Sequence, residues 1–137
     1  MKAVEYFLNG NSCSESVVSY AIDRGYADKS LLSLATPFSG GIGSGCLCGA
    51  VSGAIMTIGS LYGKDNKYGN PPIARALAKT FMDRFKEVHK VTCCRVLSRG
   101  TEAGTPERKQ HCSAFVEYSS KLLDEILSEA EVSVKNG

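Results

Sequence analysis

The sequence predicts an all-α protein, a compact bundle of about five to seven helices. Apolar residues recur at helical spacing almost throughout, as at Phe81, Phe85 and Val88. No convincing run of alternating apolar and polar residues predicts a strand. A chain of 137 residues with 43% hydrophobic residues is long enough to bury a core without disulfides, so we expect one domain over residues 1–137.

In chain order, the first three predicted helices are short. A helix over Val4 to Leu8 is followed by Asn9-Gly10, which ends it. A second begins near Ser12 and stops around Gly25. A third follows Asp28, a plausible N-cap, and ends where Pro37 interrupts it.

Three longer predicted helices complete the bundle. One spans about Cys48 to Tyr62, with small residues that let a neighbouring backbone approach. The next begins at Pro71-Pro72, because proline suits the first turn, and extends to Val88. The last opens at Cys112 and carries apolar side chains as far as Ala130.

Charge and hydropathy exclude several classes of partner. Sixteen basic and fourteen acidic residues give a net charge of +2, too little to predict a nucleic-acid or membrane-surface partner. Mixed stretches such as Glu107-Arg108-Lys109 are interpreted as solvated helix faces. The most apolar stretch, Ala50 to Leu61, falls short of the ~20 residues of a membrane span. Glu5 stands where a signal peptide would be apolar, so we expect a cytoplasmic protein.

The six cysteines form four clusters, and each cluster lies where a helix is predicted to begin. A helix start presents free N–H groups and partial positive charge, which favour thiolate over thiol. Cysteines in a reducing compartment point to metal binding or thiol chemistry. We therefore expect converging helix N-termini to form a cysteine-rich end of the bundle; its redox or disulfide candidates are Cys13, Cys46, Cys48, Cys93, Cys94 and Cys112.

Residue type leaves three chemistries open at this end. One thiolate from each cluster gives a four-sulfur metal site of Cys13, Cys48, Cys94 and Cys112, equally suited to an iron–sulfur cluster or to zinc. Thiol–disulfide exchange could use Cys46-x-Cys48 and Cys93-Cys94 without metal. Buried cysteines can also act as small apolar residues, as expected for Cys93.

A glycine-dense segment, residues 39–45, precedes the Cys46/Cys48 pair. It does not match the dinucleotide-binding motif, because Cys46 occupies the position of the third glycine. It also lacks the Gly-Lys-Ser/Thr sequence that ends a Walker motif. Glycines allow positive φ and bring N–H groups near a bound anion, although a plain flexible connection is the alternative. The predicted cofactor-binding residues are Gly41, Gly43, Gly45, Gly49 and Arg95.

The two histidines contribute less to the prediction. His89 is expected at the surface near a helix C-terminus, where a cation complements the dipole. His111 adjoins Cys112 and is a lesser candidate for binding metal or taking a proton from a thiol. No residue is assigned a catalytic role.

Four motifs together resemble the C_GCAxxG_C_C family, which is named for redox activity. Residues 48–53, Cys-Gly-Ala-Val-Ser-Gly, read as its CGAxxG element. Asn11-Ser12-Cys13 looks like its first cysteine element, Cys94-Arg95-Val96-Leu97 like its C-R-x-L element, and His111-Cys112 like its last cysteine. By position the signature cysteines would be Cys13, Cys48, Cys94 and Cys112. Cys46 and Cys93 depart from the pattern and could serve as alternate ligands or as a second redox pair.

The resemblance implies a small cytoplasmic redox protein of the kind common in anaerobic bacteria and archaea. A similar domain accompanies the haem region of split-Soret cytochromes, which favours electron transfer. We expect an iron–sulfur cluster held by four cysteines for electron transfer or sensing, in a carrier more than a stand-alone enzyme. A metal-free thiol–disulfide protein and a structural zinc module are the alternatives. The expected partner is an unidentified redox protein, and a homodimer is left open.

Overall fold

The computed structural model describes residues 1–66 and 68–136, with side chains described as far as Glu131. This part of the chain is helical and contains no strand, which confirms the all-α prediction. None of its helices is long and apolar enough to cross a membrane. The elements are α1 (Ala3–Leu8), α2 (Cys13–Asp23), α3 (Leu31–Ala35), the 3-10 turn η1 (Thr36–Phe38), the π-type turn η2 (Gly41–Gly45), α4 (Gly49–Tyr62), α5 (Pro71–His89), α6 (Cys94–Leu97) and α7 (Pro106–Asn136).

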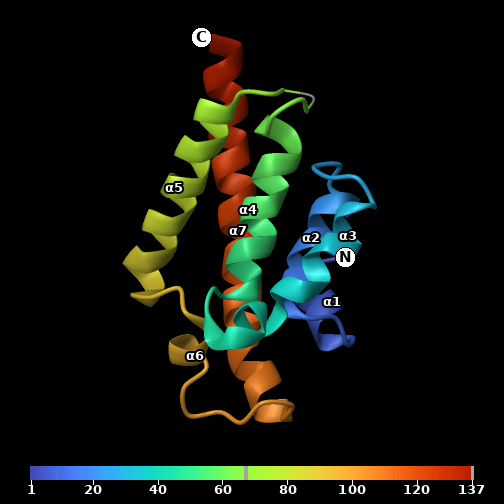
Figure 1. Ribbon diagram of the computed structural model, residues 1–137, viewed down its shortest axis with the longest axis vertical. Helices are drawn as coiled ribbons and strands as arrows, with labels where there is room; N and C mark the ends of the chain where they lie inside the picture. Colours follow the sequence, from blue (N-terminus) through green and yellow to red (C-terminus); the bar gives the residue numbers. More distant parts are fainter. Residues whose placement is uncertain (67, 137) are drawn as a thin grey trace.

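The three longest helices, α4, α5 and α7, form the body of the bundle, and α1 to α3 pack on one side of it (Figure 1). At the lower end of Figure 1, η2, the start of α4 and α6 meet the first turns of α7. The end of η2 and the segment before α6, which are 47 residues apart in the sequence, are thereby brought together at that end. This arrangement places the cysteines at one end of the bundle.

Local signals in the sequence explain the helix boundaries. The Ser12 side chain accepts a hydrogen bond from the Glu15 N–H, and the Ser12 N–H donates one to the Glu15 carboxylate, which forms a capping box at the start of α2. The Asn70 side chain accepts from the Ile73 N–H at the start of α5, and Pro71 occupies the first helical position. The predicted starts of these two helices are confirmed.

The predicted start of the C-terminal helix is wrong. α7 begins at Pro106, six residues before Cys112. Thr105 Oγ1 accepts a hydrogen bond from the Arg108 N–H at 3.2 Å, as an N-cap does, and proline follows it. Thr105-Pro106 therefore marks the start of α7 in the sequence, and Cys112 lies within the helix and not at its N-terminus.

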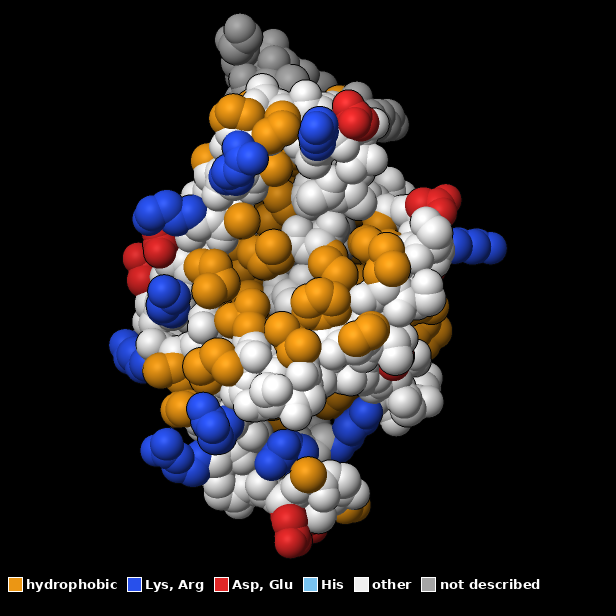
Figure 2. Space-filling model, in the orientation of Figure 1, with side chains coloured by type: hydrophobic (Ala, Val, Ile, Leu, Met, Phe, Trp, Pro, Cys, Tyr) orange, Lys and Arg blue, Asp and Glu red, His pale blue; other side chains and the backbone are white. Residues whose placement is uncertain are grey.

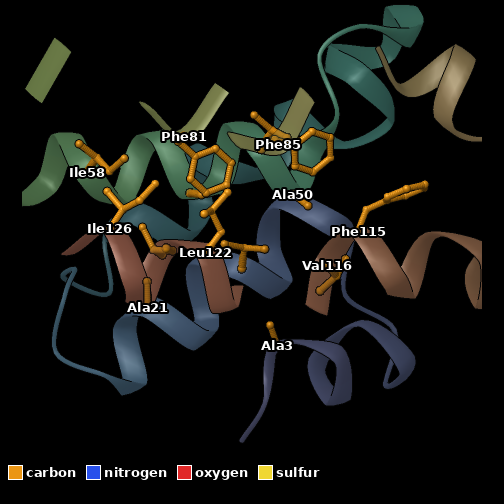
Figure 3. Packing of buried hydrophobic residues seen from close by; sticks show 14 of the residues in the cluster. Ala3, Ala21, Ala50, Ile58, Phe81, Phe85, Phe115, Val116, Leu122 and Ile126 are labelled. Atoms are coloured by element: carbon orange, nitrogen blue, oxygen red, sulfur yellow. The ribbon is translucent and has the colours of Figure 1, made fainter. Parts of the chain in front are cut away.

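The core is formed where α5 and α7 close over α4 (Figure 3). Phe81 and Phe85 of α5 are fully buried, and Ile58 of α4 and Ile126 of α7 pack in the same cluster. Burial of each such side chain contributes about 2 kcal/mol. α2 approaches α4 closely, because a Cβ at Gly53 would lie 2.9 Å from the Ser14 carbonyl oxygen.

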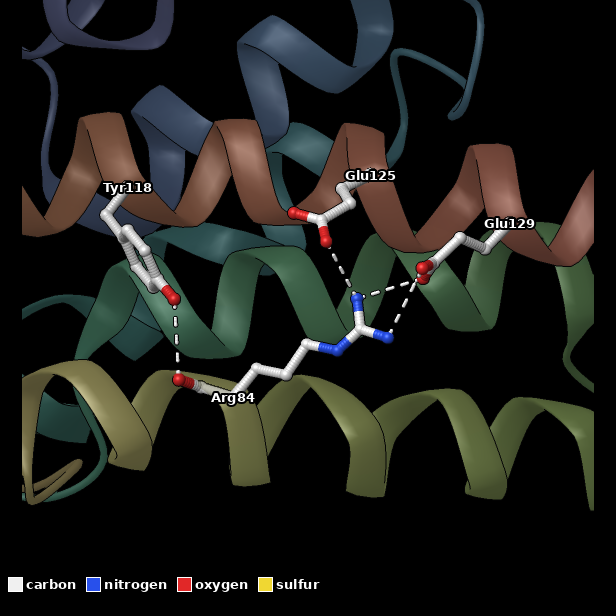
Figure 4. A network of polar contacts seen from close by, with 4 residues as sticks. All are labelled: Arg84, Tyr118, Glu125 and Glu129. Atoms are coloured by element: carbon white, nitrogen blue, oxygen red, sulfur yellow. Dashed lines mark hydrogen bonds and ion pairs between the residues drawn. The ribbon is translucent and has the colours of Figure 1, made fainter.

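A polar network joins α5 to α7 on the outside (Figure 4). The Arg84 guanidinium pairs with Glu125 at 3.1 Å and with Glu129 at 2.9 Å, and the Tyr118 hydroxyl donates to the Arg84 carbonyl at 3.4 Å. Both carboxylates are exposed, so each ion pair contributes about 1 kcal/mol or less. The network fixes the orientation of two helices that the core already holds together.

Candidate redox site at the cysteine-rich end

The six cysteines fall into two groups in the structure. Cys46 and Cys93 form a disulfide that joins η2 to the segment before α6. Cys13, Cys48, Cys94 and Cys112 are free thiols, and we call them the cysteine quartet. Cys46 and Cys93, two of the thiols that could form a second redox pair, are therefore bonded to each other, and neither short-range arrangement, Cys46-x-Cys48 or Cys93-Cys94, is bonded.

Each quartet member comes from a different helix. Cys13 is the first residue of α2, Cys48 is the N-cap of α4, and Cys94 is the first residue of α6. Cys112 lies in the second turn of α7. Cys48 and Cys112 are 4% and 7% exposed, and the other two are half-buried, so the protein shields the quartet from water.

Glycines allow the backbone to approach two of these cysteines. A Cβ at Gly41 would lie 2.9 Å from the Cβ of Cys94, and a Cβ at Gly49 would lie 3.1 Å from the Cβ of Cys13. Both positions are too close for a larger residue without displacement of the cysteine. The glycine-dense segment therefore packs directly against the quartet.

The quartet thiols share one electrostatic environment. Burial raises the pKa of Cys13, and negative charge on Cys48, Cys112 or Cys94 would raise it further. Burial also raises the pKa of Cys112, and Cys94 acts on it in the same direction. Four thiols from four helices therefore lie close enough to influence one another's ionisation.

Burial overrides the helix-start effect at Cys48. Desolvation raises the pKa of Cys48 to about 11, even though the nearby backbone N–H groups of Val51 and Ala50 act in the opposite direction. The expectation that helix N-termini would favour thiolates is thus wrong for Cys13, Cys48 and Cys112. The helix dipole contributes a small stabilisation, whereas removal of water from a sulfur anion costs more.

Two cations near the quartet were missed in the sequence. Lys109 lowers the pKa of Cys13 and Cys112, opposing the effect of burial, and Arg108 does the same for Cys112. Both are half-buried rather than on a solvated face. They precede Cys112 by three and four residues, the spacing that places side chains on one helix face, and this spacing could have revealed them.

Hydrogen bonds hold Arg108 and Lys109 in place. Arg108 donates from Nε to the Thr101 hydroxyl and from a terminal nitrogen to the Thr101 carbonyl, each at 2.9 Å. Lys109 Nζ donates to the Asn11 carbonyl at 2.8 Å and lies 3.9 Å from the centre of the Phe7 ring. Positive charge is therefore fixed beside the quartet by α1, α7 and the loop before α7.

η2 forms a left-handed turn over the site. Gly41, Ile42 and Gly43 have φ near +60° to +67°, and Gly45 has φ of +85°, so the segment needs residues that tolerate positive φ. The Cys46 N–H donates to the Gly41 carbonyl at 3.1 Å, and the Cys48 N–H donates to the Thr92 carbonyl at 2.8 Å. The first bond closes η2 on itself, and the second, with the disulfide, ties this part of the chain to the connection between α5 and α6.

The predicted cofactor-binding residues take different positions. Gly41 and Gly49 contact quartet cysteines, as described above. A Cβ at Gly45 would lie 3.0 Å from the Cβ of Arg95, and a Cβ at Gly43 would contact nothing. The Arg95 side chain is exposed. The backbone N–H groups that lower the pKa of Cys48 belong to the first turn of α4; a role for η2 and Arg95 in cofactor binding stays a prediction.

The histidines behave differently from expectation. His111 is exposed, and its Nε2 lies 2.6 Å from the Leu97 carbonyl, a hydrogen bond that joins α7 to α6. His89 is half-buried among Phe85, Phe115 and Tyr118, with ring centres 4.7–5.0 Å away, and burial lowers its pKa. The prediction of a surface cation at His89 is therefore wrong, because the aromatic side chains cover the end of α5.

The quartet fits an iron–sulfur cluster in the kind and number of its donors: four thiols, held by four elements of one fold. Zinc accepts the same donor set. Within residues 1–66 and 68–136, however, no three His, Cys, Asp or Glu side chains are already grouped so that they could hold a metal ion. Binding therefore requires the quartet side chains to draw together from the arrangement described.

Comparison with known proteins identifies the family. Residues 11–126 match the family model described as "Putative redox-active protein (C_GCAxxG_C_C)". The chain belongs to this family. No curated protein and no solved structure matches it. The matched range includes all six cysteines and every helix from α2 to the middle of α7, so the site lies entirely within the family region.

Proposed function

We propose that this C_GCAxxG_C_C protein is a cytoplasmic redox protein that binds an iron–sulfur cluster through the cysteine quartet, for electron transfer or sensing. The main support is that four free thiols from four helices lie in one electrostatic environment. Like-charge repulsion and burial oppose four separate thiolates there, and bound iron would relieve both by pairing the sulfur charge with cations. Membership of a redox-active family agrees with the proposal.

The protein's own residues would prepare the site for that group, which when bound supplies one-electron transfer. The backbone N–H groups of Ala50 and Val51, at the start of α4, lower the pKa of Cys48 and so favour negative charge on its sulfur. Lys109 and Arg108 partly offset negative charge on the quartet. Burial of Cys48 and Cys112 excludes water, and hydrogen bonding, local charge and solvent exposure are the properties that set a reduction potential.

Single replacements by serine test the ligand set. Each quartet variant, C13S, C48S, C94S and C112S, purified without oxygen, should lose most of its iron and acid-labile sulfide. The matched control is C46S/C93S, which removes two cysteines from the same end of the bundle and should retain the cluster. Full iron and sulfide retention in all four quartet variants would refute the proposal.

A second function is favoured by the disulfide between Cys46 and Cys93. Disulfides in the cytosol are usually catalytic or redox-sensing. A thiolate of a partner dithiol protein would attack one of these sulfurs, form a mixed disulfide and release the other as a thiolate. The partner's second thiol would then displace the first, so that Cys46 and Cys93 leave as two thiols and the partner becomes oxidised. This step needs no metal.

Counting thiols at controlled potentials tests this second function. In metal-free protein, alkylation should trap four thiols under oxidising conditions and six under reducing conditions, with reversible exchange between them. Thioredoxin with its reductase supplies a dithiol of known potential. A protein in which Cys46 and Cys93 stay oxidised at every potential near that of thioredoxin would contradict it.

A further inference from the structure

Positive charge is concentrated in one stretch of the chain. Residues 71–99, which contain α5 and α6, carry seven Lys and Arg side chains and two acidic ones, a net charge of +5. The rest of the chain carries nine basic and twelve acidic residues, a net charge of −3. The overall charge of +2 therefore conceals a basic segment within an acidic remainder.

Four basic residues of α5 and its C-cap lie on one side of the helix. Arg75, Lys79, Lys86 and Lys90 are spaced by four, seven and four residues, which places them within one stripe of an α-helix. All four are exposed. Phe81 and Phe85 are fully buried in the core and occupy the opposite side. Positive charge thus extends along the outer side of α5 to its C-terminal end.

The stripe is continued around α6. Arg95 and Arg99 are exposed and four residues apart, at α6 and just beyond it. We call the six residues of the stripe and its continuation the basic face: Arg75, Lys79, Lys86, Lys90, Arg95 and Arg99.

Most of this charge is not neutralised within the described part of the protein. Lys79 pairs with Asp83 at 2.6 Å. None of the other five forms an ion pair with a described carboxylate; Lys90 donates only to the Glu87 carbonyl, at 3.3 Å. By contrast, Arg84 on another side of α5 is fully occupied by Glu125 and Glu129.

An apolar area adjoins the basic face. In the orientation of Figure 1, hydrophobic side chains gather over the middle of the molecule, where α4 and α5 lie, with Lys and Arg side chains along the left and lower edges (Figure 2). Ile55 of α4 and Met82 of α5 are among the partly exposed apolar residues of these helices. An apolar centre with a charged rim is the usual composition of a protein–protein interface.

The basic face ends at the candidate redox site. α6 begins at Cys94, a quartet member that is only partly buried, and Arg95 follows it directly. The Cβ of Arg95 packs against the backbone of η2 at Gly45. A protein seated on α5 and α6 would therefore lie beside the sulfur groups.

From this charge distribution we propose that the basic face is the docking surface for an acidic electron-carrier protein. The inference rests on the proposed redox function and adds the chemistry of the partner. Carboxylates on the carrier would pair with the unneutralised cations, steer its approach and hold it over α6, while the apolar area provides contact. Electron exchange with the sulfur site would then occur across α6 and η2.

An acidic plant-type [2Fe–2S] ferredoxin is a suitable probe, with a basic cytochrome c as the probe of opposite charge. Isothermal titration of the anaerobically purified protein should give binding to ferredoxin that weakens by about tenfold or more between 50 and 300 mM salt. The cytochrome should show no comparable binding. Equal binding of both probes, or ferredoxin binding that salt does not weaken, would overturn the proposal.

Charge reversal locates the surface. K86E/K90E should weaken ferredoxin binding by about tenfold or more, since it removes two cations of the stripe and adds two anions. K29E/K64E makes the same charge change at two exposed lysines outside the basic face and should alter binding by about threefold or less. Equal losses of ferredoxin affinity in both variants would mean that net charge alone drives binding, and would refute the assignment of the docking surface.

Other occupants of the face give distinct results. Displacement of ferredoxin by an equal concentration of an RNA oligonucleotide, or a dimer that K86E/K90E converts to monomer in sedimentation, would contradict the proposal.

Iron, sulfide and thiol counts on the same samples distinguish failure of the docking surface from failure of the proposed redox function. If the protein binds ferredoxin with the expected dependence on salt and on K86E/K90E, but contains neither a cluster nor an exchangeable disulfide, the docking surface is supported and the redox function is refuted. If the protein contains the cluster but does not bind ferredoxin, the redox function is supported and the docking surface is refuted.

Discussion

Cys46 and Cys93 are bonded to each other, and the four cysteines of the quartet remain free. The bond joins η2 to the start of α6, so it closes a loop of 47 residues that includes all of α4 and α5. The same end of the bundle therefore holds one disulfide and, separately, four free thiols.

Loss of this disulfide should lower stability. Closing a loop of this length restricts the unfolded chain, an effect of about 2 to 4 kcal/mol. We expect C46S/C93S to lower the free energy of unfolding by that amount in urea titrations without reductant. The wild-type protein with dithiothreitol should show a similar loss, and dithiothreitol should not affect the variant. A wild type whose urea midpoint is insensitive to reductant would contradict the expectation.

Two glycines of η2 form a matched pair of test positions. Gly41 and Gly43 both have positive φ, but a Cβ at Gly41 would overlap the Cys46 backbone nitrogen and lie 2.9 Å from the Cβ of Cys94, and one at Gly43 would contact nothing. Alanine at either position costs about 1 to 2 kcal/mol for the left-handed backbone. G41A should lose about 1 to 3 kcal/mol more and expose Cys94 to alkylating reagents, because η2 must move. Equal alkylation of Cys94 in both variants would show that the contact does not matter.

The packing of α2 on α4 is tested by a second pair. Gly53 and Gly59 lie within α4; a Cβ at Gly53 would lie 2.9 Å from the Ser14 carbonyl, and a Cβ at Gly59 would contact nothing. G59A should stabilise the protein by about 0.5 to 1 kcal/mol through helix propensity. G53A should destabilise it by about 1 to 3 kcal/mol, because α2 is pushed away. Thermal unfolding in both variants would decide this, and stabilisation in G53A would argue against close packing.

The raised thiol pKa values predict a loss of stability at high pH in the reduced, metal-free protein. Cys48 has a pKa of about 11 when folded, above the ordinary value of 9.0, so the folded state keeps its proton longer than the unfolded state. The stabilisation from this proton is fully present below pH 9 and is lost as the pH rises through 11, a loss of about 3 kcal/mol. Burial of Cys13 and Cys112 acts in the same direction. Urea titrations of wild type and C48S should diverge over this range, whereas parallel curves would mean that Cys48 titrates normally.

The sequence predicted the helices well because their signals are local. Capping residues, prolines and apolar spacing lie within each helix, and the elements from α1 to α5 begin and end close to the predicted residues. The predicted start of α7 was wrong because the cap at Thr105-Pro106 begins the helix six residues before Cys112. That error also hid Arg108 and Lys109, which lie on the same helix face as Cys112.

The site depends on relationships that sequence patterns do not contain. Which two cysteines pair is determined by how η2 folds back on the segment before α6, over 47 residues. The ionisation of the quartet depends on burial, and burial is a property of the assembled bundle. The four free cysteines could be chosen by resemblance to the family, but their shared environment required the structure.

The central claim, that the cysteine quartet holds an iron–sulfur cluster, is tested most directly by the iron and acid-labile sulfide content of protein purified without oxygen, with the visible spectrum recorded before and after reduction. We predict iron and sulfide together, visible absorption that bleaches on reduction, and loss of all three in C48S but not in C46S/C93S. Colourless protein without iron or sulfide after anaerobic reconstitution with both would contradict the account and leave thiol–disulfide exchange at Cys46 and Cys93 as the redox chemistry.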